Sequence, residues 1–314
     1  MFGAFRFILA VLVALSHLGM VYAGFNPGQW AVISFYTLSG LLMERQFQKL
    51  SPTGNGIGAF YLDRFLRIYP LYFAVLLLAW FADRASWGDT LFNIALLPVN
   101  YLDFINVHLL IIPASSLACE VHFYVFVPLL VLCSIKTLRI ILLSSLSLFA
   151  ISPFLPHASF WAWAGFPGML FTLASGLLIN RKDFLFIKML WPIMALLLII
   201  FGIAKFSHPG LRTGININVA IGYLVAVIAI SWLDRFSPKK NWDKMLGLFS
   251  YPLFLCNGIV FDFVRSYFSI LNLITLLCAA ILFSGLLMLI VEIPFDRIRY
   301  RLRAKSPGKI SVNP

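Results

Sequence analysis

Apolar residues run along most of the chain in stretches about as long as a membrane-spanning helix, separated by short polar gaps. A helix needs about 20 mostly apolar residues to cross the hydrocarbon core of a bilayer. The pattern therefore predicts an all-α polytopic membrane protein, a single bundle of about ten transmembrane helices. The predicted spans lie near residues 5–24, 29–46, 66–83, 117–134, 138–152, 160–180, 187–205, 214–233, 246–268 and 272–292.

One further apolar stretch, residues 90–112, is interrupted by proline, asparagine, aspartate and histidine. We expect a packed loop or a re-entrant segment there instead of a span. Residues 1–296 are predicted to form the transmembrane bundle, and residues 297–314 a basic cytoplasmic tail.

The composition and the distribution of charge agree with this topology. Of the 314 residues, 61% are hydrophobic and 11% are charged, against roughly 25% charged residues in a soluble domain. Ten spans place both termini on one side, and 20 of the 24 lysine and arginine residues then fall on that side. Because cytoplasmic loops carry the excess of these residues, we predict that both termini are cytoplasmic. The net charge of +12 therefore reflects membrane topology and attraction to anionic lipid, and we predict no nucleic-acid partner.

The first apolar run could also be a secretory signal peptide with a cleavage site after Ala23. However, His17 interrupts its apolar region, and cleavage would leave nine spans and spoil the alternation of charge. We therefore expect this segment to be retained as the first span.

Metal or nucleotide-hydrolysis chemistry has little support in the sequence. The motifs HExxH, GxxxxGK and DxD are absent. The cysteines form no CxxC pair and lie in or beside apolar runs, so we predict no metal site. They are Cys119, Cys133, Cys256 and Cys278.

Two polar side chains interrupt the first predicted span. Arg6 and His17 are eleven positions apart; at ~100° per residue this is three turns plus ~20°, so they share one helix face about 16 Å apart along the axis. Ionisable groups inside a span are costly and usually face the bundle interior. We therefore predict that Arg6 lies at the cytoplasmic end of this span and that His17, a candidate functional residue, lies in the outer half of the membrane. A structural histidine paired with a backbone carbonyl is the alternative.

Glu120 lies near the predicted outer end of the fourth span, with Ser116 four residues before it and Tyr124 four residues after it. Residues four apart share a helix face. Because the topology places Glu120 and His17 in the same half of the membrane, we expect the carboxylate to contact the imidazole. It would fix the tautomer and raise the basicity of His17, as a general base requires. A purely structural ion pair or hydrogen bond is the alternative.

Arg64 and Arg67 lie three residues apart at the cytoplasmic entrance to the third span. Paired guanidinium groups suit phosphate, because each offers a planar fork of donors. The pair therefore indicates a site for a phosphate-bearing molecule. Ordinary anchoring by positive charge at the inner surface is the alternative.

Together these segments resemble the acyltransferase-3 family of integral membrane acyltransferases. Arg6 and His17 match the family's R-x10-H pattern. The segment SFYTLSGLLM (34–43), which contains Ser39, resembles the family's FFxLSGFLI, and SSLACEVHFY (115–124) resembles WSLSxExxFY. The element R-x-x-R-I-x-P is present as Arg64, Arg67, Ile68 and Pro70, and GMLFTLASGLLI at 168–179 resembles the family's small-residue span.

The resemblance implies an enzyme of the bacterial inner (cytoplasmic) membrane that O-acylates sugars, lipopolysaccharide or other envelope glycans. The donor would be a cytoplasmic acyl-CoA, with acetyl-CoA expected. The acceptor would be a hydroxyl of a glycan or lipid-linked sugar, with membrane lipid around the bundle. His17 would be the catalytic base with Glu120 orienting it, and an acyl-His17 intermediate is a variant. The implied donor site is Arg64, Arg67 and Arg6, and the implied pocket contains Ser116, Tyr124, Ser39 and Asn257.

Asn257 is the main departure from the family pattern. It lies in SYPLFLCNGIVF (250–261), which resembles a family segment where histidine is common at this position. A role for position 257 in proton transfer is therefore in question, and a catalytically inactive member is one alternative. Another is a proton-coupled transporter or flippase of a sugar or lipid, with His17 and Glu120 as a proton relay. The clear pair of broken helices often seen in transporters is absent from the sequence.

Overall fold

The computed structural model describes residues 1–50, 55–83, 86–208, 213–236, 241–267 and 272–305. Within these ranges every regular element is helical, and the one extended pairing is an isolated bridge between Tyr22 and Phe25. The α-helices are α1 (Phe2–His17), α2 (Pro27–Leu50), α3 (Asn55–Asp83), α4 (Trp87–Ala95), α5 (Ala114–Leu132), α6 (Ile135–Ile151), α7 (Phe166–Asn180), α8 (Phe184–Ser207), α9 (Thr213–Leu233), α10 (Asn241–Tyr267), α11 (Leu273–Leu287) and α12 (Ile293–Lys305). The short helices are η1 (Leu97–Tyr101), η2 (Ser152–Phe154), η3 (Phe160–Ala164) and η4 (Met288–Glu292).

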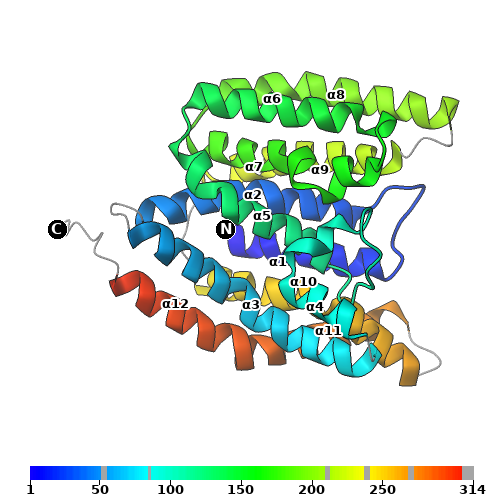
Figure 1. Ribbon diagram of the computed structural model, residues 1–314, viewed down its shortest axis with the longest axis vertical. Helices are drawn as coiled ribbons and strands as arrows, with labels where there is room; N and C mark the ends of the chain where they lie inside the picture. The colour runs from blue at the N-terminus through cyan, green and yellow to red at the C-terminus, as the bar shows by residue number, and fades with distance from the viewer. Residues whose placement is uncertain (51–54, 84–85, 209–212, 237–240, 268–271, 306–314) are drawn as a thin grey trace.

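The helices are stacked in layers (Figure 1). At one edge α6 and α8 pack on α7 and α9, which in turn pack on α2. Beyond α2, α1 packs on α10, and α11 covers α10 at the opposite edge, where α12 packs on α3. The start of α1 and the end of α12 lie toward the same end of the bundle.

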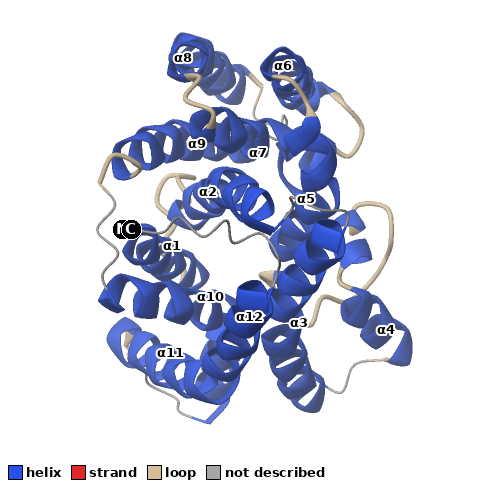
Figure 2. Ribbon diagram, turned by 90° about the vertical axis from the view of Figure 1, so that its left-hand side faces the viewer, coloured by secondary structure: helices blue, strands red, loops and turns tan. Residues whose placement is uncertain are grey.

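The centre of the bundle is α2, which packs on α1, α5, α7 and α9 (Figure 2). Its polar side chains Ser34, Thr37 and Glu44 are consequently buried among other helices. The hydroxyls of Ser34 and Thr37 donate to backbone carbonyls one turn earlier, and Glu44 is ion-paired with Arg181. A helix enclosed by protein can carry such residues, because they find partners in the bundle interior.

Eight helical segments among the described residues are long and apolar enough to span a membrane. They coincide with the third to tenth predicted spans. The first two predicted spans do not meet these criteria, because α1 has only 16 residues and α2 is too polar by composition. The count of ten spans therefore stays a prediction. The eight segments are 56–82, 114–132, 135–154, 160–180, 184–207, 213–233, 241–267 and 273–303.

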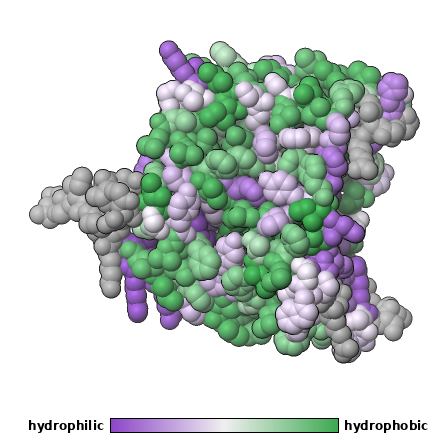
Figure 3. All heavy atoms as spheres, viewed as in Figure 1, coloured by the Kyte–Doolittle hydropathy of each residue, from purple (hydrophilic) through white to green (hydrophobic). Residues whose placement is uncertain are grey.

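The outer surface of the bundle is apolar in the way that a lipid-facing surface requires. Figure 3 shows hydrophobic side chains over much of one face, with hydrophilic side chains gathered toward both ends. On α8, for example, Leu196, Ile199 and Ile203 are each more than half exposed. Contiguous exposed apolar surface on this scale marks contact with membrane or with another protein.

The first predicted span, 5–24, is wrong in its C-terminal boundary. Helix α1 ends at His17, and the chain then turns through Gly19 and Gly24, both with positive φ. A right-handed helix cannot continue through such backbone conformations, which glycine adopts readily. His17 is therefore the last residue of its helix.

Two other local predictions have different outcomes. Helix α3 begins at Asn55, well before the predicted start at residue 66, so Arg64 and Arg67 lie inside a helix and not at its entrance. The stretch 90–112 contains no span, as expected, and holds the end of α4, the short helix η1 and irregular chain.

Helix α12 crosses residue 296, the predicted end of the bundle. Arg299 of α12 is buried, and its Nε lies 3.2 Å from a carboxylate oxygen of Asp63 on α3. The described part of the predicted tail therefore packs on the bundle as a helix. Residues 306–314 of that tail lie outside the described residues.

The close approach of α2 and α7 yields a test of the packing. A Cβ built on Gly40 would overlap the carbonyl oxygen of Leu173, and one on Gly176 would overlap that of Thr37. Because backbone must move to admit a methyl group, we expect Gly40→Ala to destabilise the protein by about 1–3 kcal/mol. The thermal unfolding temperature of the purified protein in detergent measures this.

Gly202→Ala is the matched control, since a Cβ at Gly202 meets no atom within 4 Å. Alanine favours the helix there by about 1 kcal/mol, so this variant should be as stable as the parent or more so. Equal melting temperatures for Gly40→Ala and the parent would contradict the close packing.

Candidate functional site

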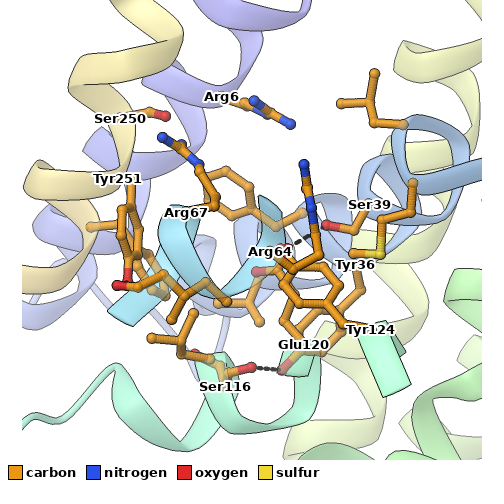
Figure 4. A pocket seen from close by; sticks show the side chains of 17 residues that line it. Arg6, Tyr36, Ser39, Arg64, Arg67, Ser116, Glu120, Tyr124, Ser250 and Tyr251 are labelled. Carbon is orange, nitrogen blue, oxygen red and sulfur yellow. Dashed lines mark hydrogen bonds between the residues drawn. The ribbon is translucent and has the colours of Figure 1, made fainter. Parts of the chain in front are cut away.

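A cavity lies between α1, α2, α3, α5 and α10 and contains about 770 Å³ of space, counting the part open to solvent. It collects polar side chains from helices far apart in the sequence (Figure 4). Seven of the nine predicted site residues line it; His17 and Asn257 do not. Its polar lining is Arg6, Tyr36, Ser39, Arg64, Arg67, Ser116, Glu120, Tyr124, Ser250 and Tyr251.

Three guanidinium groups gather at one side of this cavity (Figure 4). Arg67 is paired with Glu292, with 2.7 Å between Nη1 and Oε2, and its guanidinium carbon lies 5.2 Å from the centre of the Tyr251 ring. Arg64 is paired with its neighbour Asp63. The predicted arginine pair on α3 therefore faces a common space. Arg67 is paired with Glu292, and Arg64 with a carboxylate that it shares with two arginines of α12.

Arg6 differs from the other two cations in its partners. It projects from α1 into the same cavity, close to Arg64, Arg67 and Glu120. Unlike the α3 arginines, it is not ion-paired within the described part of the chain. Because it is half-buried and faces two other cations, its charge is the one most available to a bound anion.

Glu120 is held by two hydroxyl donors at the opposite side of the cavity. Ser39 on α2 and Tyr124 on α5 donate to its Oε1 at 2.7 and 2.8 Å. The ring of Tyr124 in turn lies under the Arg64 guanidinium, 5.5 Å from its carbon to the ring centre. Ser116, Glu120 and Tyr124 all face the cavity, so the prediction that they share one helix face is confirmed.

The predicted contact between His17 and Glu120 is not formed. The imidazole Nδ1 of His17 instead lies 2.6 Å from Oδ1 of Asn257 on α10. Glu120 is six residues into α5, or about 9 Å from that helix's start, whereas His17 ends α1. Glu120 therefore lies deeper in the bundle, beside Arg6 instead of beside the histidine.

His17 and Asn257 lie beyond one end of the cavity. On α10, Tyr251 and Phe254 line the cavity, and Asn257 is one turn further along. Phe254 packs edge-to-face on Phe35 of α2, with ring centres 5.7 Å apart. The site thus has a cationic compartment and a separate imidazole, with an aromatic pair at the cavity end nearer the histidine.

Asp63 supports the cavity wall through its ion pair with Arg64, a role that the sequence pattern did not predict. Its carboxylate is 98% buried and receives Arg64 of its own helix together with Arg299 and Arg303 of α12, at 3.2 and 2.8 Å. An aspartate one residue before an arginine in an apolar segment was the available signal. Its partners on α12 come from a segment that was predicted to be a tail.

The described residues contain no cluster of side chains with the make-up of a metal site. No group of three or more histidine, cysteine or carboxylate side chains there could hold a metal ion, and the four cysteines are free.

Comparison with known proteins gives a family match over nearly the whole chain. The model of the acyltransferase-3 family, described as an acyltransferase domain, matches residues 2–295. An uncharacterized protein of Aquifex aeolicus is 24% identical over 202 residues, covering 60% of this chain and 90% of that protein. No solved structure matches the chain.

The carboxylate of Asp63 should be essential to the architecture around the cavity. Asp63→Asn would remove the carboxylate that Arg64, Arg299 and Arg303 share, and it would leave the buried Arg299 only its 3.6 Å ion pair with Asp296. Breaking a buried ion pair from one side typically costs about 3–5 kcal/mol. We expect a large fall in the thermal unfolding temperature in detergent, or loss of folded protein.

Lys244→Ala is the control, because it removes an ion pair to Asp296 whose lysine is 64% exposed. Exposed pairs contribute only about 0–1 kcal/mol, so this variant should melt near the parent. If Asp63→Asn unfolded at the same temperature as Lys244→Ala, the structural role of the Asp63 cluster would be refuted.

Proposed function

This chain belongs to the acyltransferase-3 family, and on that premise we propose that it transfers an acyl group, acetyl in particular, from cytoplasmic acyl-CoA to a hydroxyl of a glycan or lipid-linked sugar. The observation that carries the donor assignment is the cavity with Arg6, Arg64 and Arg67 on one side. Guanidinium forks pair well with phosphate oxygens, and the CoA end of the donor carries several phosphates. Arg6 offers the least neutralised charge of the three.

His17 is proposed as the general base. The acceptor hydroxyl loses its proton to the free imidazole nitrogen as its oxygen attacks the thioester carbonyl carbon. The carbon–sulfur bond then breaks, the ester remains on the acceptor, and the CoA thiolate leaves with that proton. An acyl-His17 intermediate would use the same nitrogen as nucleophile and add a second transfer step.

The distance between the two compartments suits a donor with a long arm. Arg6 and His17 are about 16 Å apart along α1. We propose that the phosphates stay with the arginines while the pantetheine arm extends past Phe35 and Phe254, so that the thioester meets the acceptor at His17. Donor and acceptor would then approach from opposite sides of the membrane.

The proposed role of Glu120 differs from the one expected from the sequence. Since it binds Ser39 and Tyr124 instead of His17, it is placed to organise the donor cavity. Its bond to the Tyr124 hydroxyl holds a ring against Arg64. We therefore propose that Glu120 contributes to donor binding and that a different residue orients the imidazole of His17.

The proton-coupled transporter is less well supported. A relay between His17 and Glu120 would need the two groups to be linked, and each is hydrogen-bonded to other residues. The family match also favours an enzyme.

Donor binding and transfer should separate in variants of the protein purified in lipid nanodiscs. Arg6→Ala should weaken acetyl-CoA binding at least about tenfold, equivalent to ~1.4 kcal/mol, because it removes a charged donor. His17→Ala should bind acetyl-CoA normally. In a strain that lacks the parent protein, His17→Ala should fail to restore an ester mass on envelope or secreted glycans, as measured by mass spectrometry.

Arg265→Ala serves as the matched control, since this arginine is exposed near the last residue of α10 and does not line the cavity. It should bind and transfer like the parent. Normal glycan ester in a well-inserted His17→Ala strain would overturn the assignment of the base. Unchanged donor affinity in Arg6→Ala would overturn the donor site.

We also propose that the protein lies in the bacterial inner membrane with both termini in the cytoplasm, on the strength of the lysine and arginine distribution. A C-terminal green fluorescent protein fusion should fluoresce, and alkaline phosphatase at the same point should be inactive. Alkaline phosphatase fused after the exposed Asp103 should be active. The reverse pattern of fusion activities would show that the topology is opposite to the one proposed.

A further inference from the structure

The orientation of the Asn257 side chain is set by the backbone of its own helix. Its amide Nδ2 donates to the carbonyl oxygens of Leu253 and Phe254, at 3.0 and 2.8 Å, so both amide hydrogens are used. The side chain is fully buried. A flipped amide would set Oδ1 against those two carbonyl oxygens, so it is Oδ1 that faces His17.

The donor and the acceptor of the hydrogen bond between Asn257 and His17 are then fixed. An amide oxygen accepts and never donates. Because Oδ1 lies 2.6 Å from the imidazole Nδ1, that nitrogen must carry the proton. A neutral imidazole with its proton on Nδ1 has its lone pair on Nε2.

We propose that Asn257 is a positioning residue that holds His17 as the Nδ1-protonated tautomer and leaves Nε2 as the reactive nitrogen. The inference rests on the proposed function and names the residue that orients its base. It applies to both mechanisms, because a general base and an acyl-accepting nucleophile each need the lone pair on Nε2.

The packing at the other end of the two helices keeps this contact in register. The backbone N–H groups of Gly3 and Ala4 donate to the Asp243 carboxylate at 3.2 and 2.8 Å. A Cβ on Gly3 would overlap the carbonyl oxygen of Asp243, so the two backbones touch there. With α1 fixed at its first turn, the position of its last residue along α10 is fixed as well.

Asn257 orients the imidazole without adding charge to it. Beyond Asn257, α10 carries Asp262 and Arg265, which are both exposed, and Glu120 of α5 is hydrogen-bonded in the cavity. The first two turns of α2 carry no acidic or basic side chain. The amide thus supplies a hydrogen-bond acceptor without placing a negative charge beside the imidazole.

The test compares Asn257→Leu and Asn257→Asp by the pH dependence of kcat in the purified enzyme with acetyl-CoA. Asn257→Leu removes the acceptor, so kcat should fall about 10²-fold or more, with unchanged KM for acetyl-CoA. Asn257→Asp keeps an acceptor oxygen and should retain transfer. Its negative charge stabilises the protonated imidazole, so the acid-side fall in kcat should move to higher pH, which a merely structural role would not produce.

Cys256→Ala is the control for disturbing the same buried turn, since Cys256 is buried and its thiol contacts Ser284 instead of the site. It should leave kcat and its pH dependence unchanged. Full kcat in Asn257→Leu, or an unmoved acid limb in an active Asn257→Asp, would overturn the proposal.

A spectroscopic measurement on the parent protein tests the tautomer of His17 without relying on catalysis or on the folding of position-257 variants. The chain has five histidines, so ¹⁵N-histidine NMR can assign His17 by comparison with His17→Ala. A protonated Nδ1 and an unprotonated Nε2 are expected, and the opposite tautomer overturns the inference. If His17→Ala still transfers acyl groups while the NMR shows this tautomer, the proposed function fails and the tautomer assignment stands.

Discussion

The parallel packing of α1 on α10 is the contact on which the site depends. At one end the backbone of Gly3 meets Asp243, and at the other His17 meets Asn257. Between these points α1 directs Arg6 into the cavity. A short helix could slide along a smooth apolar neighbour at little cost, whereas polar contacts at both ends fix its register. The same contact therefore sets the position of the cation and of the imidazole.

Most of the charged side chains around the cavity are ion-paired with side chains of opposite charge. Arg67 has Glu292, Arg64 has Asp63, and Asp63 also receives two arginines of α12. These pairs tie α3 to the last helices and hold the cavity wall in place. Arg6 lacks such a partner within the described residues, and leaving a half-buried cation unbalanced costs stability. The proposed binding of the donor phosphates would offset that cost.

Helical periodicity was a good guide to which side chains share a face, and a poor guide to depth. It correctly grouped Ser116 with Glu120 and Tyr124, because spacing along one helix is fixed by the backbone. It could not place Glu120 relative to His17, since the offset between two helices depends on packing that no single segment encodes. Hydropathy likewise did not indicate that α2 is enclosed by other helices, where its Glu44 is ion-paired with Arg181, a residue distant in sequence.

Under our proposal, Asn257 takes over from Glu120 the role of orienting the His17 imidazole. The sequence suggested that a carboxylate would orient the histidine and that asparagine in place of a common histidine weakened the case for catalysis. In the folded chain the backbone of α10 engages both amide hydrogens of Asn257, and this leaves an oxygen that can only accept. Tautomer control needs a fixed acceptor and no charge. Asparagine on a helix whose carbonyls lock it meets that need, so the departure from the family pattern is compatible with an active base.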